Sequence, residues 1–357
     1  MQDISPTEAS VLPIESFDPQ ELEYGVWRIP VPVPFGARAT NLYLLRSGSS
    51  ERWCLIDCPL RTAHAEATFR AGLAAAGVAP EQIGSIVITH THPDHVGGAG
   101  YWQRETGASI YLLALQMRSL PALWHDPSNS AFLAAARELA AHGMNAEEAQ
   151  TLVTRAVQIR SALEVAVHPT LLAHEQSIHL TGATYRVLWT PGHDDGHLCL
   201  LRDDGLFVAG DAVLSGIRPT IGWYPWSRPD PLRDQFTSLA TLGALPVRLA
   251  LPGHGRHFTD LKSRTDELAG IYARELVITA RILADTDGGL DAYTLAHQLY
   301  EDRWRSRESQ LLAIAESVAR LEHLRFLGRA ERTIGSDGAI IYHRTREDSA
   351  LPIIASE

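Results

Sequence analysis

Three histidines and one aspartate lie within six residues, in the run Thr89-His90-Thr91-His92-Pro93-Asp94-His95. Imidazole nitrogens and carboxylate oxygens suit zinc and other first-row divalent ions, and no nearby cysteine suggests a structural zinc knot. The run follows the apolar residues 86–88, which predict a buried strand that ends where the ligand-bearing loop begins. The pattern therefore predicts a metal site at a strand end rather than a histidine-rich surface loop.

Four further segments place a ligand type directly after an apolar stretch. They are Leu55-Ile56-Asp57, Thr190-Pro191-Gly192-His193, Val208-Ala209-Gly210-Asp211 and Leu251-Pro252-Gly253-His254. Because loops at the ends of several strands can converge on one point, these segments predict a single metal centre assembled from distant parts of the chain.

Together these motifs resemble the metallo-β-lactamase fold superfamily, and specifically its two-metal hydrolase branch, which includes glyoxalase II and related thioesterases and lactonases. The resemblance covers roughly residues 22–260 and implies an α/β chain folded as an αββα sandwich. It implies two metal sites and one bridging residue, namely His90, His92 and His193 for the first ion, Asp94, His95 and His254 for the second, and Asp211 between them.

Two further residues are expected beside the ligands. The resemblance implies that Asp57 orients a ligand without binding metal, as carboxylates near metal-bound histidines commonly do, and a helix or turn cap is the alternative. His197, four residues past His193, is a candidate for contacting a ligand or the substrate, with a purely structural role equally open.

The implied reaction is hydrolysis by a hydroxide that bridges two metal ions and attacks a thioester, ester or lactone carbonyl of a small molecule. Asp94 is the candidate catalytic residue, because its carboxylate can aim the hydroxide and pass a proton to the leaving group. Zinc is the expected ion, with manganese or iron as alternatives. Asp211 stands where the best-known β-lactamases carry cysteine, and Leu214 where quorum-sensing lactonases carry tyrosine, so neither activity is expected in its usual form.

Two regions outside the motifs are expected to be helical. Residues from about 115 to 175 predict an insertion that either roofs the metal site or serves packing, including contact within a homodimer. Residues 261–345 predict three helices and a β-hairpin, similar to the winged-helix tail of some family members, followed by a tail at 346–357. The aromatic residues Trp223, Tyr224 and Trp226 are candidates for a substrate-pocket wall, with packing against the winged helix as the alternative.

A winged helix raises a second function class, a metal-dependent endoribonuclease or phosphodiesterase. Its region contains many arginines that could contact phosphate, namely Arg303, Arg305, Arg307, Arg320, Arg325, Arg329 and Arg332. Acidic residues alternate with them, so a nucleic-acid partner is the weaker expectation. A mononuclear iron persulfide dioxygenase, which retains part of the same motif, is a third alternative.

Composition agrees with an ordinary globular enzyme. The 357 residues are 45% apolar and 20% charged, and the formal net charge of -11 opposes nonspecific attraction to nucleic acid or anionic membranes. Three cysteines do not form a disulfide framework and are expected to be buried apolar residues. Neither an export signal nor a bilayer-spanning stretch is evident, so a cytoplasmic protein without a membrane partner is expected, with residues 1–21 as a flexible extension.

Overall fold

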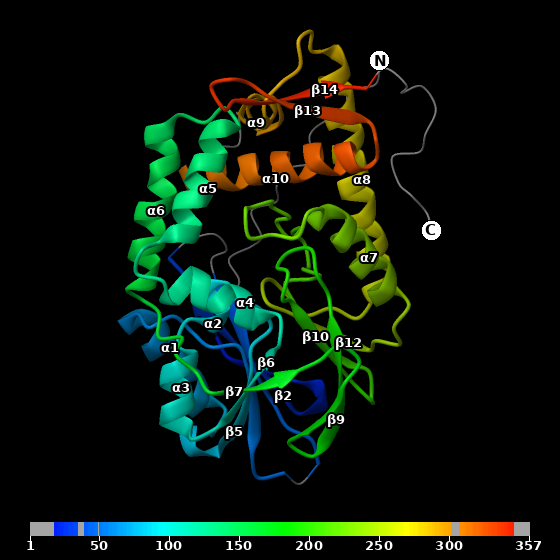
Figure 1. Ribbon diagram of the computed structural model, residues 1–357. Helices are drawn as coiled ribbons and strands as arrows, with labels where there is room; N and C mark the ends of the chain where they lie inside the picture. The colour runs from blue at the N-terminus through cyan, green and yellow to red at the C-terminus, as the bar shows by residue number, and fades with distance from the viewer. Residues whose placement is uncertain (1–17, 35–38, 49, 301–306, 346–357) are drawn as a thin grey trace.

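The computed structural model describes residues 18–34, 39–48, 50–300 and 307–345, and its centre is a pair of β-sheets packed face to face (Figure 1). The first sheet has the strand order β1 (Gln20–Leu22), β2 (Val26–Pro32), β3 (Ala39–Leu45), β4 (Trp53–Ile56), β5 (Ile83–Val87), β6 (Ser109–Leu113) and β7 (Pro169–Leu172). The second has the order β12 (Leu249–Pro252), β11 (Leu206–Gly210), β10 (Leu198–Arg202), β9 (Ala183–Trp189) and β8 (Ser177–Leu180).

Alternation along the strands explains why both faces of each sheet are covered. In β3, Tyr43 and Leu45 join the core between the two sheets, whereas Leu42 and Leu44 join the core under the helices. Strand β10 divides in the same way, with Leu198 and Leu200 facing the other sheet. Successive side chains of a strand point to opposite faces, so these continuous apolar runs require cover on both sides.

Helices supply the outer layers. The first sheet is covered by α1 (Ala63–Ala75), α2 (Pro93–Val96) and α3 (Ala99–Thr106), and the second by α7 (Pro231–Gly243) and the start of α8 (Leu261–Asp285). Thr62 caps α1 by accepting a hydrogen bond from the Ala65 amide at 3.2 Å, and Asp230 and Asp260 cap α7 and α8. The αββα sandwich expected from the sequence is therefore confirmed.

The helical insertion consists of α4 (Gln116–Leu120), a π-helical turn (Pro121–His125), α5 (Ser130–Ala141) and α6 (Ala146–Arg160). Asn145 caps α6, accepting from the Glu147 amide at 2.9 Å. The predicted end of the insertion near residue 175 is wrong, because residues 169–172 form β7, which pairs in parallel with β6. This edge strand is short and partly exposed, so it lacks the apolar alternation that marks a strand in sequence.

The predicted flexible extension also needs correction. Gln20–Leu22 form β1, which pairs with β2 through a tight turn in which Tyr24 and Gly25 have φ values of 64° and 70°. The exposed, polar residues of this edge strand gave no strand signal in the sequence. Residues 1–17 of the extension and the tail at 346–357 lie outside the described residues.

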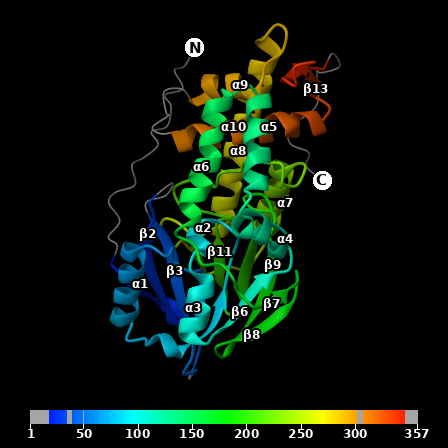
Figure 2. The same cartoon turned by 60° about the vertical axis from the view of Figure 1, so that its left-hand side comes forward.

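The C-terminal region contains the expected elements. After α8 come α9 (Ala292–Tyr300), α10 (Arg307–Phe326) and a hairpin of β13 (Ala330–Ile334) and β14 (Ile340–Arg344), with a bridge between Leu290 and Tyr342. Figures 1 and 2 show α5 and α6 rising from the sandwich to meet this region. The Tyr293 amide donates to the His142 carbonyl at 3.0 Å, and the His142 ring stacks on that of Tyr342. The insertion therefore joins the sandwich to the C-terminal elements.

Cys54, Cys58 and Cys199 are buried free thiols, as predicted. Among the helices of the described chain, none is long and apolar enough to cross a bilayer.

Candidate metal centre

The predicted ligands and Asp57 lie at one edge of the sandwich because each follows the C-terminal end of a strand. Asp57 follows β4, the run of residues 90–95 follows β5, and His193, Asp211 and His254 follow β9, β11 and β12. Backbone hydrogen bonds hold the loops together, such as the Leu198 amide to the Thr89 carbonyl at 2.9 Å and the Gly253 amide to the Gly210 carbonyl at 2.8 Å. The fold thus delivers five loops to one place.

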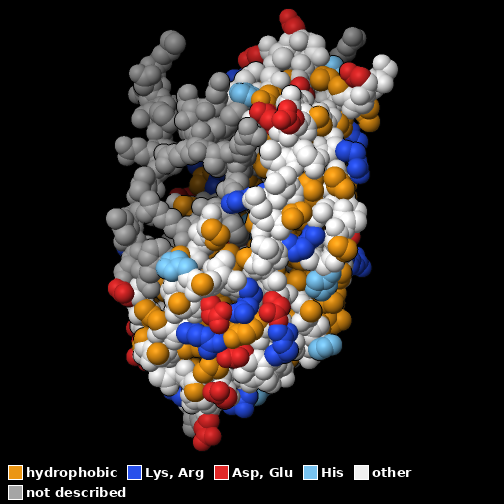
Figure 3. Space-filling model, turned by 90° about the vertical axis from the view of Figure 1, so that its left-hand side faces the viewer, with side chains coloured by type: hydrophobic (Ala, Val, Ile, Leu, Met, Phe, Trp, Pro, Cys, Tyr) orange, Lys and Arg blue, Asp and Glu red, His pale blue; other side chains and the backbone are white. Residues whose placement is uncertain are grey.

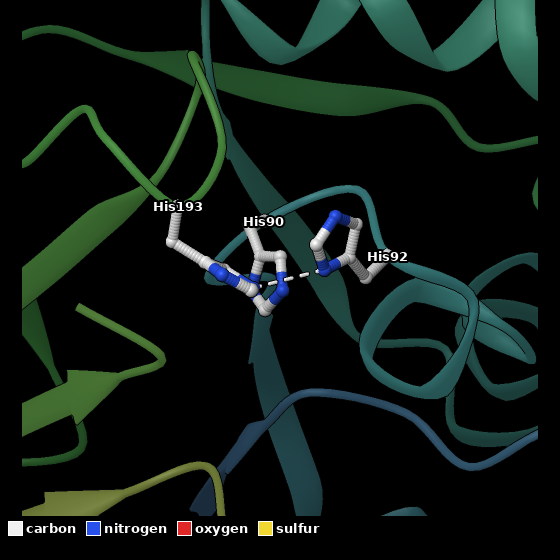
Figure 4. Close-up of side chains that lie close together, drawn as sticks. All are labelled: His90, His92 and His193. Atoms are coloured by element: carbon white, nitrogen blue, oxygen red, sulfur yellow. Dashed lines mark hydrogen bonds between the residues drawn. The ribbon is translucent and has the colours of Figure 1, made fainter. Parts of the chain in front are cut away.

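The side chains converge in the groups expected from the sequence. Ligand atoms of His90, His92 and His193 lie within 4.8 Å of one another, as do those of Asp94, His95 and His254. Figure 4 shows the three rings of the first group turned toward one another, with His92 Nδ1 3.0 Å from His193 Nε2. The structure therefore brings together residues up to about 160 positions apart.

Asp211 lies between the two groups. Its Oδ2 atom is 3.5 Å from His193 Nε2 in the first group and 3.2 Å from His254 Nε2 in the second. Asp211 also forms a third overlapping group with His90 and His95. This position is the one that a carboxylate bridging two ions requires.

Close approach of the loops requires glycine at one position. A Cβ atom on Gly253 would lie 2.1 Å from Asp211 Oδ1 and 2.7 Å from His95 Cε1. No other residue fits there without displacing two predicted ligands, so Gly253 lets the His254 loop close over the centre.

The donor set fits a pair of divalent ions. His90 Nε2 and Asp211 Oδ1 are buried and have no hydrogen-bond partner in the described part of the chain. Buried polar atoms almost always have a partner, and a divalent cation held by these groups would supply one to both the nitrogen and the carboxylate oxygen. Nitrogen and oxygen donors together suit zinc, manganese or iron, and their types do not select among these metals.

The first group is electrostatically ready to bind a cation. Burial lowers the pKa of His90, and the neighbouring His95 and His92 rings lower it further. Burial and His92 together lower the pKa of His193 to about 4, although Asp211 opposes this change. Both rings are neutral at pH 7, which is the protonation state in which imidazole binds metal.

Carboxylates dominate the electrostatics of the second group. Burial opposes protonation of His95, but Asp211, Asp94 and Asp57 outweigh it and raise its pKa to about 10. Burial is likewise outweighed at His254, whose pKa is raised by Asp211. The carboxylates therefore attract positive charge, which a bound divalent ion would supply in place of protons.

Asp57 lies where an orienting carboxylate is needed. Its Oδ2 accepts a hydrogen bond from His95 Nδ1 at 2.8 Å, and its Oδ1 accepts from the Thr89 amide at 2.7 Å. His95 Nε2 consequently faces the cluster, 3.6 Å from Asp94 Oδ2. Asp57 thus contacts a predicted ligand and shows no role as a helix cap.

His197 contacts the backbone of the predicted bridging residue. Its Nε2 accepts from the Asp211 amide at 2.9 Å, so its Nδ1 carries the proton and donates to Thr190 Oγ1 at 2.8 Å. The ring is fully buried, which favours positioning of the Asp211 loop over contact with substrate.

Two buried residues that the sequence did not single out also hold the centre. Thr40 Oγ1 donates to Asp94 Oδ2 at 2.7 Å. Gln116 Nε2 lies 3.1 Å from the Ile88 carbonyl oxygen, 2.9 Å from that of Thr89 and 3.1 Å from that of Gly196, and so ties the two histidine loops together. No pattern near either residue signals these contacts, because their partners are distant in sequence.

The aromatic residues proposed as a pocket wall pack against two other elements. The Tyr224 and Trp226 rings stack at 4.9 Å, and Trp226 meets Phe132 of α5 edge-on at 5.6 Å. The Trp223 amide donates to the Ala315 carbonyl of α10 at 3.0 Å. The alternative of packing against the C-terminal helices is therefore observed for Trp223, and a substrate-facing role stays a prediction for all three.

Comparison with known proteins identifies the family. Residues 35–254 match the family model described as the metallo-beta-lactamase superfamily. The chain belongs to this superfamily. Its match to the lactamase-like protein adaB of Aspergillus niger is 33% identical over 93 residues, 26% of this chain and 27% of that protein. The chain thus aligns with only about a quarter of the length of that relative.

Three other known proteins match most of the length of this chain. It is 24% identical over 329 residues to the "Probable metallo-hydrolase YqjP" of Bacillus subtilis, 89% of this chain and 97% of that protein. A metallo-beta-lactamase family protein of Thermus thermophilus is 30% identical with a TM-score of 0.77, over 90% of this chain and 99% of that one. A beta-lactamase domain protein from Burkholderia ambifaria shares the fold, with 22% identity and a TM-score of 0.81 over 94% and 97% of the two chains.

One relative carries a named activity. The atrochrysone carboxyl ACP thioesterase of Aspergillus fumigatus is 24% identical over 234 residues, which are 64% of this chain and 55% of that protein. The alignment includes a little over half of the length of that thioesterase.

Proposed function

We propose that this superfamily hydrolase uses two divalent metal ions, zinc in the first instance, to cleave a thioester or carboxylic ester, including lactones, of a small molecule. The observation that carries the proposal is the position of Asp211, whose Oδ2 lies 3.5 Å from His193 Nε2 and 3.2 Å from His254 Nε2. A single-ion centre would need neither the second donor group nor a carboxylate shared between the two. The same feature disfavours a mononuclear iron dioxygenase.

When bound, two such ions would supply a water-derived nucleophile near neutral pH and polarise the carbonyl oxygen under attack. The chain's own contribution is to hold protons and orient groups. Burial opposes ionisation of Asp94, but His95 and His254 outweigh it, so the Asp94 pKa is lowered and its carboxylate is ionised at pH 7 and can accept a hydrogen bond. Its hydrogen bond from Thr40 leaves one oxygen fixed at the cluster. We assign Asp94 the transfer of a proton to the leaving group.

No cysteine of this chain competes for the role of nucleophile. Burial raises the pKa of the Cys54 and Cys199 thiols to about 12, and burial together with Asp57 raises that of Cys58 well above its usual value. The thiolate is the reactive form of cysteine, so these residues are inert at neutral pH.

Carbonyl esters are favoured over phosphodiesters by the state of the C-terminal arginines. Arg320 is buried and binds Glu275 at 2.7 Å, and Arg325 and Arg332 both bind Glu322, at 2.7 and 3.1 Å. Figure 3 shows basic and acidic side chains intermingled on the face over α1 and α3. The charges of Arg320, Arg325 and Arg332 are thus already neutralised by glutamates, whereas nucleic-acid binding requires cations available to phosphate. Arg303 and Arg305 lie outside the described residues.

The experiment that tests the proposal is a hydrolysis panel on zinc-loaded protein, comprising acyl thioesters, acyl esters, lactones, a phosphodiester and RNA. We expect turnover of a carbonyl substrate that falls by more than about a hundredfold in Asp211→Ala, since loss of even an outer partner of a metal ligand costs about 10- to 100-fold. Asp203→Ala, an exposed aspartate on the same β-hairpin, is the matched control and should retain full activity. Cleavage of phosphodiesters alone, or full activity of Asp211→Ala, would overturn the proposal.

A further inference from the structure

The loop of residues 214–223, which follows the predicted bridging aspartate, ends beside a metal-ligand histidine. It contains neither helix nor strand. The carbonyl oxygen of Thr220 in this loop accepts a hydrogen bond from His193 Nδ1 at 2.9 Å. This bond places the proton on Nδ1 and leaves Nε2 free, facing His92 Nδ1 at 3.0 Å. A backbone carbonyl of the 214–223 loop therefore sets the tautomer and direction of His193.

The C-terminal helices hold the 214–223 loop in place. From α8, Arg264 Nε donates to the Leu214 carbonyl at 2.6 Å, and Arg264 Nη2 donates to the Ile217 carbonyl at 2.5 Å. The Tyr272 hydroxyl, also on α8, donates to the Pro219 carbonyl at 2.7 Å. Because Pro219 and Thr220 are consecutive residues, fixing the Pro219 carbonyl restricts the position of the Thr220 carbonyl.

A partly buried ion network joins the same loop to both helices. The Arg218 guanidinium binds Glu316 of α10 at 2.7 Å and Glu275 of α8 at 3.1 Å. Arg320 binds the same two glutamates, at 2.7 Å to Glu275 and 3.4 Å to Glu316. Separating paired charges of which Glu316 and Arg320 are buried is costly, so this network ties the loop to the C-terminal helices.

We propose that α8 and α10 control the affinity of the metal ion on the His193 side, and that Tyr272 is the positioning residue through which they act. The path runs from the Tyr272 hydroxyl to the Pro219 carbonyl, then to the Thr220 carbonyl and His193 Nδ1. Tyr272 is 2% exposed, so water does not replace its hydroxyl. The proposal rests on the two-ion site proposed above and gives the C-terminal region a role in metal binding.

Tyr272→Phe tests this path because it removes the hydroxyl and keeps the ring. The measurement is the pair of stepwise zinc(II) dissociation constants, obtained by competition with a chromophoric chelator. We expect one constant to rise about tenfold, the lower end of the effect of losing an outer partner of a ligand, and the other to stay within about twofold. The matched control is Tyr342→Phe, which loses an equally buried hydroxyl, bonded to Glu322 at 2.6 Å, away from the loop. Both of its constants should stay within about twofold of the wild-type values, because that hydroxyl does not touch the loop.

A second variant covers the case in which Tyr272→Phe does not fold. Arg264→Lys retains the positive charge but loses the guanidinium that donates to two loop carbonyls. It should weaken the binding of the same single zinc ion. An equal rise of both zinc dissociation constants, or unchanged constants in both variants, would overturn the proposal. Wild-type protein that binds fewer than two zinc ions would instead contradict the two-ion function, so the two failures are distinguishable.

Discussion

Replacing Asp57 with asparagine isolates the contribution of a single negative charge behind the metal centre. The backbone of Asp57 has a φ of 62°, in the left-handed region, which asparagine adopts as readily as aspartate. The substitution keeps size and backbone preference, so any effect comes from the side-chain atoms. Asp57 accepts hydrogen bonds on both oxygens, from His95 Nδ1 at 2.8 Å and from the Thr89 amide at 2.7 Å.

An asparagine at position 57 can satisfy only one of these donors. If the asparagine amide nitrogen faces His95, it donates to Nδ1 and the ring proton moves to Nε2, the atom that would bind metal. If the amide nitrogen faces Thr89 instead, its N–H groups and the buried Thr89 N–H oppose each other. Leaving one buried donor unsatisfied costs about 1–3 kcal/mol. At about 1.4 kcal/mol per tenfold change, the expected loss in affinity for one ion is about 5- to 140-fold.

The assay is again a stepwise zinc(II) competition titration, with thermal unfolding of the metal-free protein as a check on folding. Asp230→Asn is the matched control, because Asp230 is also a buried carboxylate bonded to a histidine, His323, at 2.9 Å. It should lower stability and leave both zinc affinities unchanged. If Asp57→Asn binds both ions within about twofold of the wild type, Asp57 is only a turn residue and the assignment fails.

Two further substitutions probe stability. Burial lowers the pKa of His142 to about 4, below the value of about 6.5 in an unfolded chain, so its stabilising contribution is complete above pH 6.5 and is lost as the pH falls toward 4. Between pH 8 and pH 5, metal-free wild-type protein should lose about 2 kcal/mol more of its free energy of unfolding than His142→Phe, measured with urea, and equal losses would contradict this assignment. Gln116→Met should lower stability by about 1–3 kcal/mol by removing the donor shared by three loop carbonyls, and Gln103→Met, which loses an exposed amide, is its control. An unchanged melting temperature for Gln116→Met would show that the shared donor is dispensable.

Several core strands can be recognised in the sequence because each is an apolar run ended by a turn. Those at residues 39–45, 53–56, 109–113 and 198–202 have the bounds that such runs indicate. Strands β1, β7 and β8 were not predicted, because they are three or four residues long and expose polar side chains at or near sheet edges. Within the region expected to be helical, α6 ends at Arg160, since the Leu163 amide turns back to the Arg160 carbonyl at 3.0 Å.

The candidate site divides in the same way. Ligand types could be recognised because each histidine or aspartate follows a strand, and Asp57 could be expected beside them for the same reason. Thr40 reaches Asp94 across 54 residues, and Gln116 reaches Gly196 across 80, through contacts made only when the sheets pack. Likewise the Thr220 carbonyl has no side-chain signature. Tertiary contacts of backbone groups leave no mark in a single sequence, so these supports required the structure.

Metal stoichiometry is the measurement that tests the central claim most directly. Elemental analysis of protein purified without added metal, and again after loading with zinc and removal of excess, gives ions per chain for the wild type and for Asp211→Ala. The geometry of two donor groups joined by Asp211 predicts two ions per wild-type chain and fewer in the variant. A single ion per wild-type chain under loading conditions, unchanged by Asp211→Ala, would contradict the two-metal account.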